Sequence, residues 1–235
     1  MKICVIPDIH GRTVWRDIIT TDNYDKIVFL GDYLDTRDYI SINNQCNNFR
    51  EIVRYKKANK NQVILLLGNH DFHYTLYCRD SYSGYKAATD ANVGRDVLEA
   101  IKDGSIEACY SYDKFLFSHA GISKEWLENN NCENFDNPEK IAIFVNNLLK
   151  YIPRVFNFTP GPNNSGYGDD TCQGPIWIRP DSLLKSSLEG ITQVVGHTQD
   201  EKIIIHNNLI LTDTLGYSKE FLVITDGVPE IRLIK

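Results

Sequence analysis

Short, continuous runs of apolar residues recur along the chain and predict strands that are buried on both faces. The runs are rich in Val, Ile, Leu and Phe, and they lie at 3–7 (ICVIP), 26–30 (KIVFL), 62–67 (QVILLL), 114–118 (KFLFS) and 193–195 (QVV). Between the early runs, residues 12–20 and 46–60 place apolar side chains about every 3.6 residues, which is typical of amphipathic helices. Strands that alternate with helices predict a largely parallel sheet for the first half of the chain.

The pattern changes after about residue 175, where short strands are separated by turn residues. The predicted strands are PIWI (175–178), ITQVV (191–195), KIIIH (202–206), NLILT (208–212), FLVIT (221–225) and VPEIRLI (228–234). Asn207-Asn208 and Asp226-Gly227 predict hairpin turns. A helix is expected over 138–152, with Pro138 near its start and Pro153 just after its end. We therefore expect a more antiparallel second half and an α/β fold of two packed mixed β-sheets flanked by helices.

Length and composition favour one soluble domain over residues 1–235, long enough to bury a core without disulfides. The 25 Lys and Arg against 31 Asp and Glu give a formal net charge of -6, which argues against general nucleic-acid binding. The first ten residues do not form a secretory signal, no segment is long enough to cross a membrane, and the six cysteines include no C-x-x-C pair. We expect reduced thiols and a cytoplasmic protein. The Gly- and Pro-rich stretch 159–170 is a surface loop, or alternatively a mobile loop that borders a site.

Polar side chains with ligand chemistry follow five of the predicted strands. The strand ends carry Asp8 and His10, then Asp32 and Asp35, then Asn69 and His70, then His119, and finally His197. Ligands of open α/β sheets bind in the crevice beyond the carboxyl ends of the strands, so these side chains are expected to converge.

Carboxylate, imidazole and amide oxygen together suit Mn²⁺, Fe²⁺ or Zn²⁺ better than Ca²⁺ or a structural zinc. The donors are too many for one ion that keeps an open coordination position. Two ions about 3.5 to 4 Å apart, bridged by a carboxylate, would use all of them, and such pairs catalyse in-line displacement at phosphorus. Each residue taken singly also has an ordinary structural interpretation, such as a turn at Asp8 or Asp32 or a helix N-cap at Asn69. Five such endings in one chain favour the metal site.

The segments PDIHG, GDYLDTR, LLGNHD, SHAG and VGHT, in this order, resemble the calcineurin-like metallophosphoesterases. The elements HAG and GHT, followed by Asp213-Thr214, are most similar to those of one branch of the family. This branch contains the serine/threonine protein phosphatases and their bacterial and phage relatives, among them diadenosine tetraphosphate hydrolases. The motifs span residues 7 to about 216. The resemblance implies a four-layer αββα sandwich with two divalent metal ions, Mn²⁺ foremost and Fe, Zn or Mg as alternatives.

Carried over residue by residue, the resemblance implies that one ion is held by Asp8, His10 and Asp32. Asp32 would bridge to a second ion held by Asn69, His119 and His197, and a hydroxide bridging the metals would attack phosphorus. His70 matches the general acid for the leaving oxygen, and Asp35 matches the acid that orients it.

Two arginines are candidates for binding the phosphate. The family usually has Arg directly after the second Asp of its second block, whereas here Thr36 intervenes before Arg37, which is either a phosphate ligand or a surface residue. Arg179 in IWIRP resembles the W-x-R element of the bacterial and phage relatives, and its alternative is an ordinary ion pair with Asp181.

These residues predict a metal-dependent phosphoesterase that hydrolyses a phosphomonoester, either phosphoserine or phosphothreonine in a protein or a small phosphorylated substrate. A nucleotide or dinucleoside polyphosphate hydrolase is the alternative with the same chemistry. A non-catalytic scaffold of the same fold is the third hypothesis, and the complete set of ligands together with His70 argues against it. His73 and His206 match no motif; a role at the edge of the substrate is conceivable for His73, and His206 is expected in a hairpin.

Overall fold

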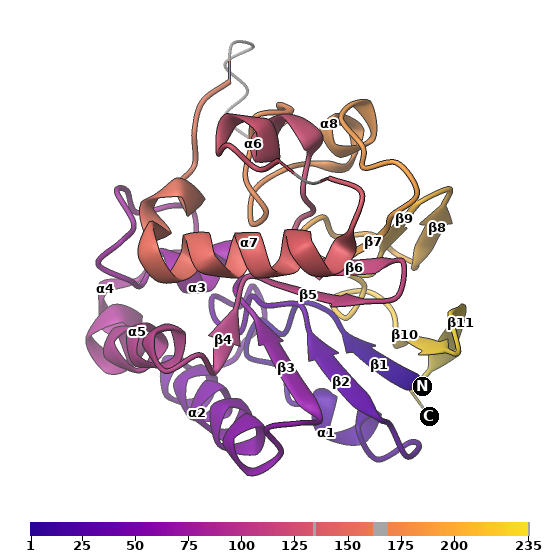
Figure 1. Ribbon diagram of the computed structural model, residues 1–235. Helices are drawn as coiled ribbons and strands as arrows, with labels where there is room; N and C mark the ends of the chain where they lie inside the picture. The colour runs from indigo at the N-terminus through magenta and orange to yellow at the C-terminus, as the bar shows by residue number, and fades with distance from the viewer. Residues whose placement is uncertain (134, 162–168, 235) are drawn as a thin grey trace.

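Two β-sheets lie face to face in the middle of the molecule, with helices on their outer sides (Figure 1). The computed structural model describes residues 1–133, 135–161 and 169–234. The expected α/β architecture of two mixed sheets flanked by helices is confirmed. Most of the 159–170 stretch lies outside the described residues.

The first sheet has the strand order β11-β10-β1-β2-β3-β4. Its strands are β1 (Lys2–Ile6), β2 (Lys26–Phe29), β3 (Val63–Leu66), β4 (Ile106–Glu107), β10 (Glu220–Thr225) and β11 (Val228–Leu233). Strands β1 to β4 are parallel, as predicted for the first half of the chain, while β10 and β11 add an antiparallel hairpin at one edge. The turn of that hairpin has positive φ at Asp226 (49°) and Gly227 (82°), as a two-residue hairpin turn requires.

The second sheet has the order β5-β6-β7-β9-β8. Its strands are β5 (Cys109–Tyr112), β6 (Phe115–Ser118), β7 (Thr192–Val195), β8 (Ile204–His206) and β9 (Leu209–Leu211). The second half is more antiparallel than the first, as expected: β5 and β8 at the edges of this sheet pair antiparallel, while β6, β7 and β9 at its centre are parallel. Long connections return the chain to the same end of the sheet before β7 and allow the parallel pairing. His206 ends β8 at the predicted Asn207-Asn208 hairpin.

Helices on both outer sides complete the four layers. They are α1 (Trp15–Ile18), α2 (Ile42–Ala58), α3 (Asn69–Phe72), α4 (Ala87–Thr89), a π-helical turn (Asp90–Gly94), α5 (Arg95–Lys102), α6 (Lys124–Asn129), α7 (Pro138–Tyr151), a 3-10 turn (Pro153–Phe156) and α8 (Pro180–Lys185). The helix expected over 138–152 is confirmed; Asn137 caps it by accepting the N–H of Lys140. The helix expected over 12–20 is reduced to a single turn.

Alternation along the strands explains why they are apolar throughout. Ile3 and Val5 of β1 point between the sheets, where they join a cluster with Phe117 and Val194 of the second sheet. Side chains at the intervening positions, such as Cys4, pack with the helices on the outer side. Because successive side chains of a strand point to opposite faces, a strand between two layers must be apolar at every position.

The segment 175–178 (PIWI) forms turns and is not the predicted strand. The Trp177 N–H donates to the carbonyl of Gly174 at 3.0 Å, and the Pro175 carbonyl accepts the Ala120 N–H at 2.7 Å. Ile176 and Ile178 are fully buried. An apolar run indicates burial, and here burial occurs in a turn that packs beside the end of β6.

Candidate metal centre and phosphate pocket

Five strands, three from the first sheet and two from the second, deliver the predicted site residues to one place. Asp8 and His10 follow β1, Asp32 and Asp35 follow β2, Asn69 and His70 follow β3, His119 follows β6, and His197 follows β7. Most of these side chains are buried or partly buried in a cavity of about 630 Å³, which His10, Asp32, Asp35, Asn69, His70 and His197 help to line.

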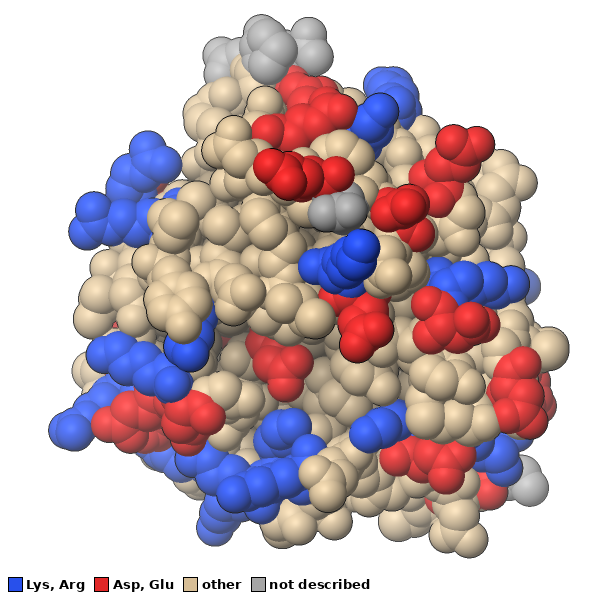
Figure 2. Space-filling model, viewed as in Figure 1, with Lys and Arg blue, Asp and Glu red and all other residues tan. Residues whose placement is uncertain are grey.

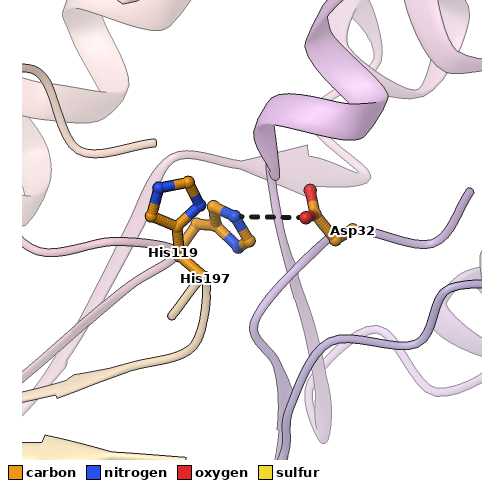
Figure 3. A group of neighbouring side chains, drawn as sticks. All are labelled: Asp32, His119 and His197. Carbon is orange, nitrogen blue, oxygen red and sulfur yellow. Dashed lines mark ion pairs between the residues drawn. The ribbon is translucent and has the colours of Figure 1, made fainter. Parts of the chain in front are cut away.

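Among the residues that the structure describes, three groups of three side chains have the geometry to hold a metal ion; one is Asp35, His70 and His73, and the other two share Asp32. Asp8, His10 and Asp32 form one group, and Asp32, His119 and His197 form the other; within each group the ligand atoms lie within 4.8 Å of one another. Figure 3 shows the imidazoles of His119 and His197 beside the Asp32 carboxylate, with His119 Nε2 3.5 Å from Asp32 Oδ2. Asn69 Oδ1 lies 2.9 Å from His119 Nε2 and 3.0 Å from His197 Nδ1, which adds the amide to the second group.

Backbone carbonyls fix the tautomers of the three histidines. His10 Nδ1 lies 2.9 Å from the Leu34 carbonyl, His119 Nδ1 lies 2.8 Å from that of Leu30, and His197 Nε2 lies 3.1 Å from that of Trp177. A carbonyl only accepts, so each of these nitrogens carries the proton. The other nitrogen of each ring then presents a lone pair to Asp32 and Asn69. Lone pairs of nitrogen and oxygen that face one another with no proton between them are suited to bind a cation. A hydrogen-bond acceptor on the other ring nitrogen is also typical of a metal-bound histidine.

Burial also keeps these imidazoles neutral. Removal from water lowers the pKa of His10 and His119 despite the nearby Asp32 carboxylate. It lowers the pKa of His197 further, with Arg179 acting in the same direction. Neutral imidazole is the form that binds a metal ion.

The backbone at the strand ends is held in a conformation that non-glycine residues rarely adopt. The φ angles of His10, Asp32, Asp35 and His197 are 45°, 49°, 59° and 64°. Such strain persists where the surrounding structure enforces it, and it is concentrated at functional sites. Close packing enforces it here: a Cβ on Gly68 would lie 2.2 Å from the backbone nitrogen of Asp32.

His70 lies beside the two groups and is held by a carboxylate. Its Nδ1 is 3.1 Å from Asp35 Oδ2, and its backbone N–H donates to Asp32 Oδ1 at 2.9 Å. Burial opposes the charged imidazole, but Asp32 and Asp35 outweigh it and raise the pKa of His70. His70 therefore differs from the three neutral imidazoles, because its environment favours the protonated form that donates a proton.

Asp35 also receives hydrogen bonds that the sequence did not indicate. His73 Nε2 lies 2.6 Å from Asp35 Oδ2, and the Tyr74 hydroxyl donates to Asp35 Oδ1. Burial raises the pKa of Asp35, but these partners and His70 outweigh it and lower the pKa overall. His73 is buried behind the carboxylate, so the idea that it contacts substrate at the pocket edge is wrong.

Three arginines reach the cavity. Arg37 is exposed at its lining, and Arg179 donates from Nη1 to the His197 carbonyl and to Thr198 Oγ1, both at 3.2 Å. Arg12, which sequence analysis missed, directly follows the PDIHG motif and binds Asp38 through Nε at 2.8 Å. Within the described ranges its buried Nη1 has no hydrogen-bond partner. Position next to the first motif was the one sequence signal for Arg12.

Asp213 is a further buried carboxylate at the cavity. It is 4% exposed, and its Oδ1 has no hydrogen-bond partner among the residues that the structure describes. Burial and the nearby Asp32 raise its pKa to about 7, against the opposing effect of the guanidiniums of Arg12, Arg37 and Arg179. Its place in the Asp213-Thr214 motif was noted from the sequence, but no role was assigned to it.

Comparison with solved structures identifies the fold as that of phosphatases. A cold-active protein-tyrosine phosphatase from a psychrophilic Shewanella superposes with a TM-score of 0.63 at 18% identity, over 100% of this chain and 80% of that one. A Saccharomyces cerevisiae protein serine/threonine phosphatase with similarity to human PP5 superposes with a TM-score of 0.57 at 14% identity, again over 100% and 80%. These identities support likeness of fold alone.

The sequence itself assigns the family. The model of the calcineurin-like phosphoesterase family matches residues 1–198, and the chain belongs to that family. No curated protein matches it significantly by sequence. The protein is thus a metal-dependent enzyme that hydrolyses phosphoester bonds, as the resemblance of its motifs implied.

Proposed function

We propose that the protein is a binuclear-metal phosphomonoesterase. The observation that carries the proposal is the pair of ligand groups that share Asp32, with His70 held beside them by Asp35. Asp8, His10 and Asp32 hold one ion, and Asp32, Asn69, His119 and His197 hold the other. Two divalent ions, of which Mn²⁺ suits these donors, supply Lewis-acid activation of phosphate and of the attacking water.

The chain's own residues perform the remaining steps. Arg179 and Arg37 bind phosphate oxygens and orient the phosphoryl group. His70, protonated between Asp32 and Asp35, donates a proton to the leaving oxygen. Asp35 is a positioning residue: through Oδ2 it fixes the ring of His70, and through its other donors it remains ionised.

The substrate in this proposal is a phosphorylated side chain of a protein or a small phosphomonoester. The phosphatases of similar fold act on phosphoproteins according to their descriptions, which supports this choice. Hydrolysis of a nucleotide or dinucleoside polyphosphate by the same residues is the second candidate, and the three arginines at the cavity favour it because they offer charge for more than one phosphate.

A substrate panel tests the proposal. The metal-stripped protein is reconstituted with Mn²⁺, Fe²⁺, Zn²⁺ or Mg²⁺ and assayed on para-nitrophenyl phosphate, a phosphothreonine peptide and diadenosine tetraphosphate. We expect phosphate release from the monoesters. Faster cleavage of the dinucleotide would assign the second function, and retention of metal without turnover of any substrate would refute both.

No helix among the described residues has the length and apolarity needed to cross a bilayer. The cysteines that the structure describes are free thiols. The face in Figure 2 mixes both signs of charge: Lys and Arg gather toward the lower left, near α2 and α5, with acidic side chains among them. This mixture supports the proposal that the protein is not a general nucleic-acid binder.

A further inference from the structure

Three aromatic side chains line one part of the cavity, and the reaction described above assigns them no role. They are Tyr82, Phe158 and Trp177. Their rings pack edge to face: the centroids of Tyr82 and Trp177 are 4.4 Å apart, and those of Phe158 and Trp177 are 5.4 Å apart. We call these three residues the aromatic wall.

The aromatic wall is fixed in place by hydrogen bonds. Trp177 Nε1 donates to the Phe156 carbonyl at 2.8 Å, and the Tyr82 hydroxyl accepts the Phe158 N–H at 3.2 Å. Trp177 is only 7% exposed. A surface that is ordered before binding loses little conformational entropy when a ligand packs against it.

The aromatic wall adjoins the part of the site from which the leaving group departs. A Cβ on Gly84 would lie 3.0 Å from His70 Cε1, so the segment after Tyr82 runs directly against the proposed proton donor. The Trp177 carbonyl binds His197. Arg12 lies elsewhere on the lining, since its Nη2 would be 3.2 Å from a Cβ on Gly216. The segment 82–84 thus joins the aromatic wall to the side of His70 within the same cavity.

We infer that the aromatic wall is a subsite for an aromatic leaving group, which makes the preferred substrate an aryl phosphomonoester, namely phosphotyrosine in a peptide. The inference rests on the proposed function and narrows its substrate. A phosphotyrosine ring is bonded directly to the phosphate ester oxygen, so a phosphate at the metal centre places the ring beside His70. Aromatic rings favour edge-to-face contacts with one another. The alkyl chain of phosphoserine or phosphothreonine is too small to fill such a wall.

The reaction is an ordinary hydrolysis. The water oxygen forms a bond to phosphorus, and the bond between phosphorus and the phenolic oxygen breaks with its electron pair on that oxygen. The proton from His70 Nε2 yields neutral tyrosine, the attacking water loses a proton, and inorganic phosphate is released. His70 is reprotonated from solvent.

Two phosphopeptides of identical sequence, one with phosphotyrosine and one with phosphothreonine, test the inference on the Mn²⁺-loaded enzyme. We expect Tyr82→Leu to lower the ratio of kcat/KM for phosphotyrosine over phosphothreonine by about tenfold, mainly through KM. The ratio is compared between the wild-type enzyme and the variant for the same two peptides, so the difference in intrinsic reactivity between the peptides cancels. Tyr82→Phe keeps the ring and loses only the hydroxyl that accepts the Phe158 N–H, so the ratio should fall much less than in Tyr82→Leu. Tyr151→Leu, at a position of α7 that is 68% exposed, is the control and should not change it.

The outcomes separate this inference from the proposed function. If the wild-type enzyme cleaves phosphothreonine as well as phosphotyrosine, or if Tyr82→Leu slows both equally, the aromatic subsite is refuted while the phosphomonoesterase stands. Preference for a nucleoside monophosphate or diadenosine tetraphosphate would also refute it. Failure to cleave any phosphomonoester, para-nitrophenyl phosphate included, with metal bound, would refute the proposed function as well.

Discussion

The four imidazoles at the site have two different roles in the proposed reaction, and the hydrogen bonds of each ring distinguish the two roles. The proton of His10, His119 and His197 faces a backbone carbonyl, whereas Nδ1 of His70 faces the Asp35 carboxylate. A carbonyl orients a neutral ring, but a carboxylate also stabilises the cation. The first environment yields a metal ligand, and the second yields a proton donor.

This division predicts different results for two single substitutions. His70→Asn should lower kcat by roughly 100- to 1,000-fold, within the range for a general acid, and leave both metal ions bound. Asp32→Asn should lower the metal content, because Asp32 belongs to both ligand groups. Bound metal per chain, by elemental analysis, and kcat on a phosphothreonine peptide, whose alkoxide leaving group needs a proton, check the prediction. Equal loss of metal in the two variants would contradict the roles assigned to them.

At the scale of elements, the site depends on how tightly the strand ends pack. The Asp8 carboxylate accepts the His197 N–H at 3.0 Å, which joins the end of β1 to the end of β7 in the other sheet. Gly196 makes this approach possible, since a Cβ there would lie 1.9 Å from Asp8 Oδ1. Glycine is needed at that position for space, because its φ is not in the left-handed region.

Gly196→Ala should therefore displace Asp8 and reduce both metal content and activity by at least tenfold, given how strongly catalysis depends on the placement of reacting groups. Gly104→Ala is the control: its φ is 74°, and nothing lies within 4 Å of the added Cβ. It should cost about 1 kcal/mol of stability through backbone strain and leave activity unchanged. Metal content, activity and Tm of both variants test this prediction. Full activity in Gly196→Ala would contradict the conclusion that the site has no room for a Cβ at Gly196.

The sequence was informative where one local pattern determines one local structure. The Asp, Asn and His side chains that follow β1, β2, β3, β6 and β7 meet at one site, because parallel strands of a sheet share one carboxyl edge. It misled at residues 175–178, where apolar side chains indicated burial but not the turn that buries them. It did not predict the contacts of His73 and Tyr74 with Asp35, because these contacts join residues 38 and 39 positions apart and no periodicity records them.

At the scale of the whole molecule, charge links distant parts of the chain. Asp22 accepts hydrogen bonds from Lys2 of β1 at 2.8 Å and from Arg232 of β11 at 3.0 Å. These partners lower the pKa of Asp22. A carboxyl whose pKa is lowered by folding stabilises the folded state at any pH above its ordinary pKa. The stabilisation is lost as the pH falls, first through the pKa of the unfolded chain and then through the pKa of the folded chain.

Asp22→Asn should accordingly lower Tm at pH 7, by roughly 2 °C for a partly exposed ion pair in a chain of this size, and lower it by less at pH 2, which lies below the ordinary pKa of the carboxyl. Asp136→Asn, at an exposed position, is the control at both pH values. Thermal unfolding followed by circular dichroism measures the difference. A Tm deficit that persists undiminished at pH 2 would show that the effect of Asp22 is not electrostatic.

The largest charge effect is expected at the metal centre, where three buried carboxylates lie near one another. Burial and mutual repulsion raise the pKa of Asp8, and Asp213 is raised in the same way by burial and Asp32. Divalent cations that bind only the folded chain both relieve this repulsion and stabilise the fold by mass action, by about 2.7 kcal/mol at 100 times Kd.

Addition of Mn²⁺ to the metal-stripped protein should therefore raise Tm by roughly 5 to 10 °C, because each kcal/mol corresponds to about 2–4 °C for a chain of this length. Asp32→Asn, which lacks the shared ligand, should respond much less, and Mg²⁺ should give a smaller shift than Mn²⁺ because imidazole is a poor ligand for it. Differential scanning calorimetry over a range of Mn²⁺ concentrations checks this. A Tm that does not depend on Mn²⁺, or an equal shift in Asp32→Asn, would show that the five strand ends do not form a metal centre.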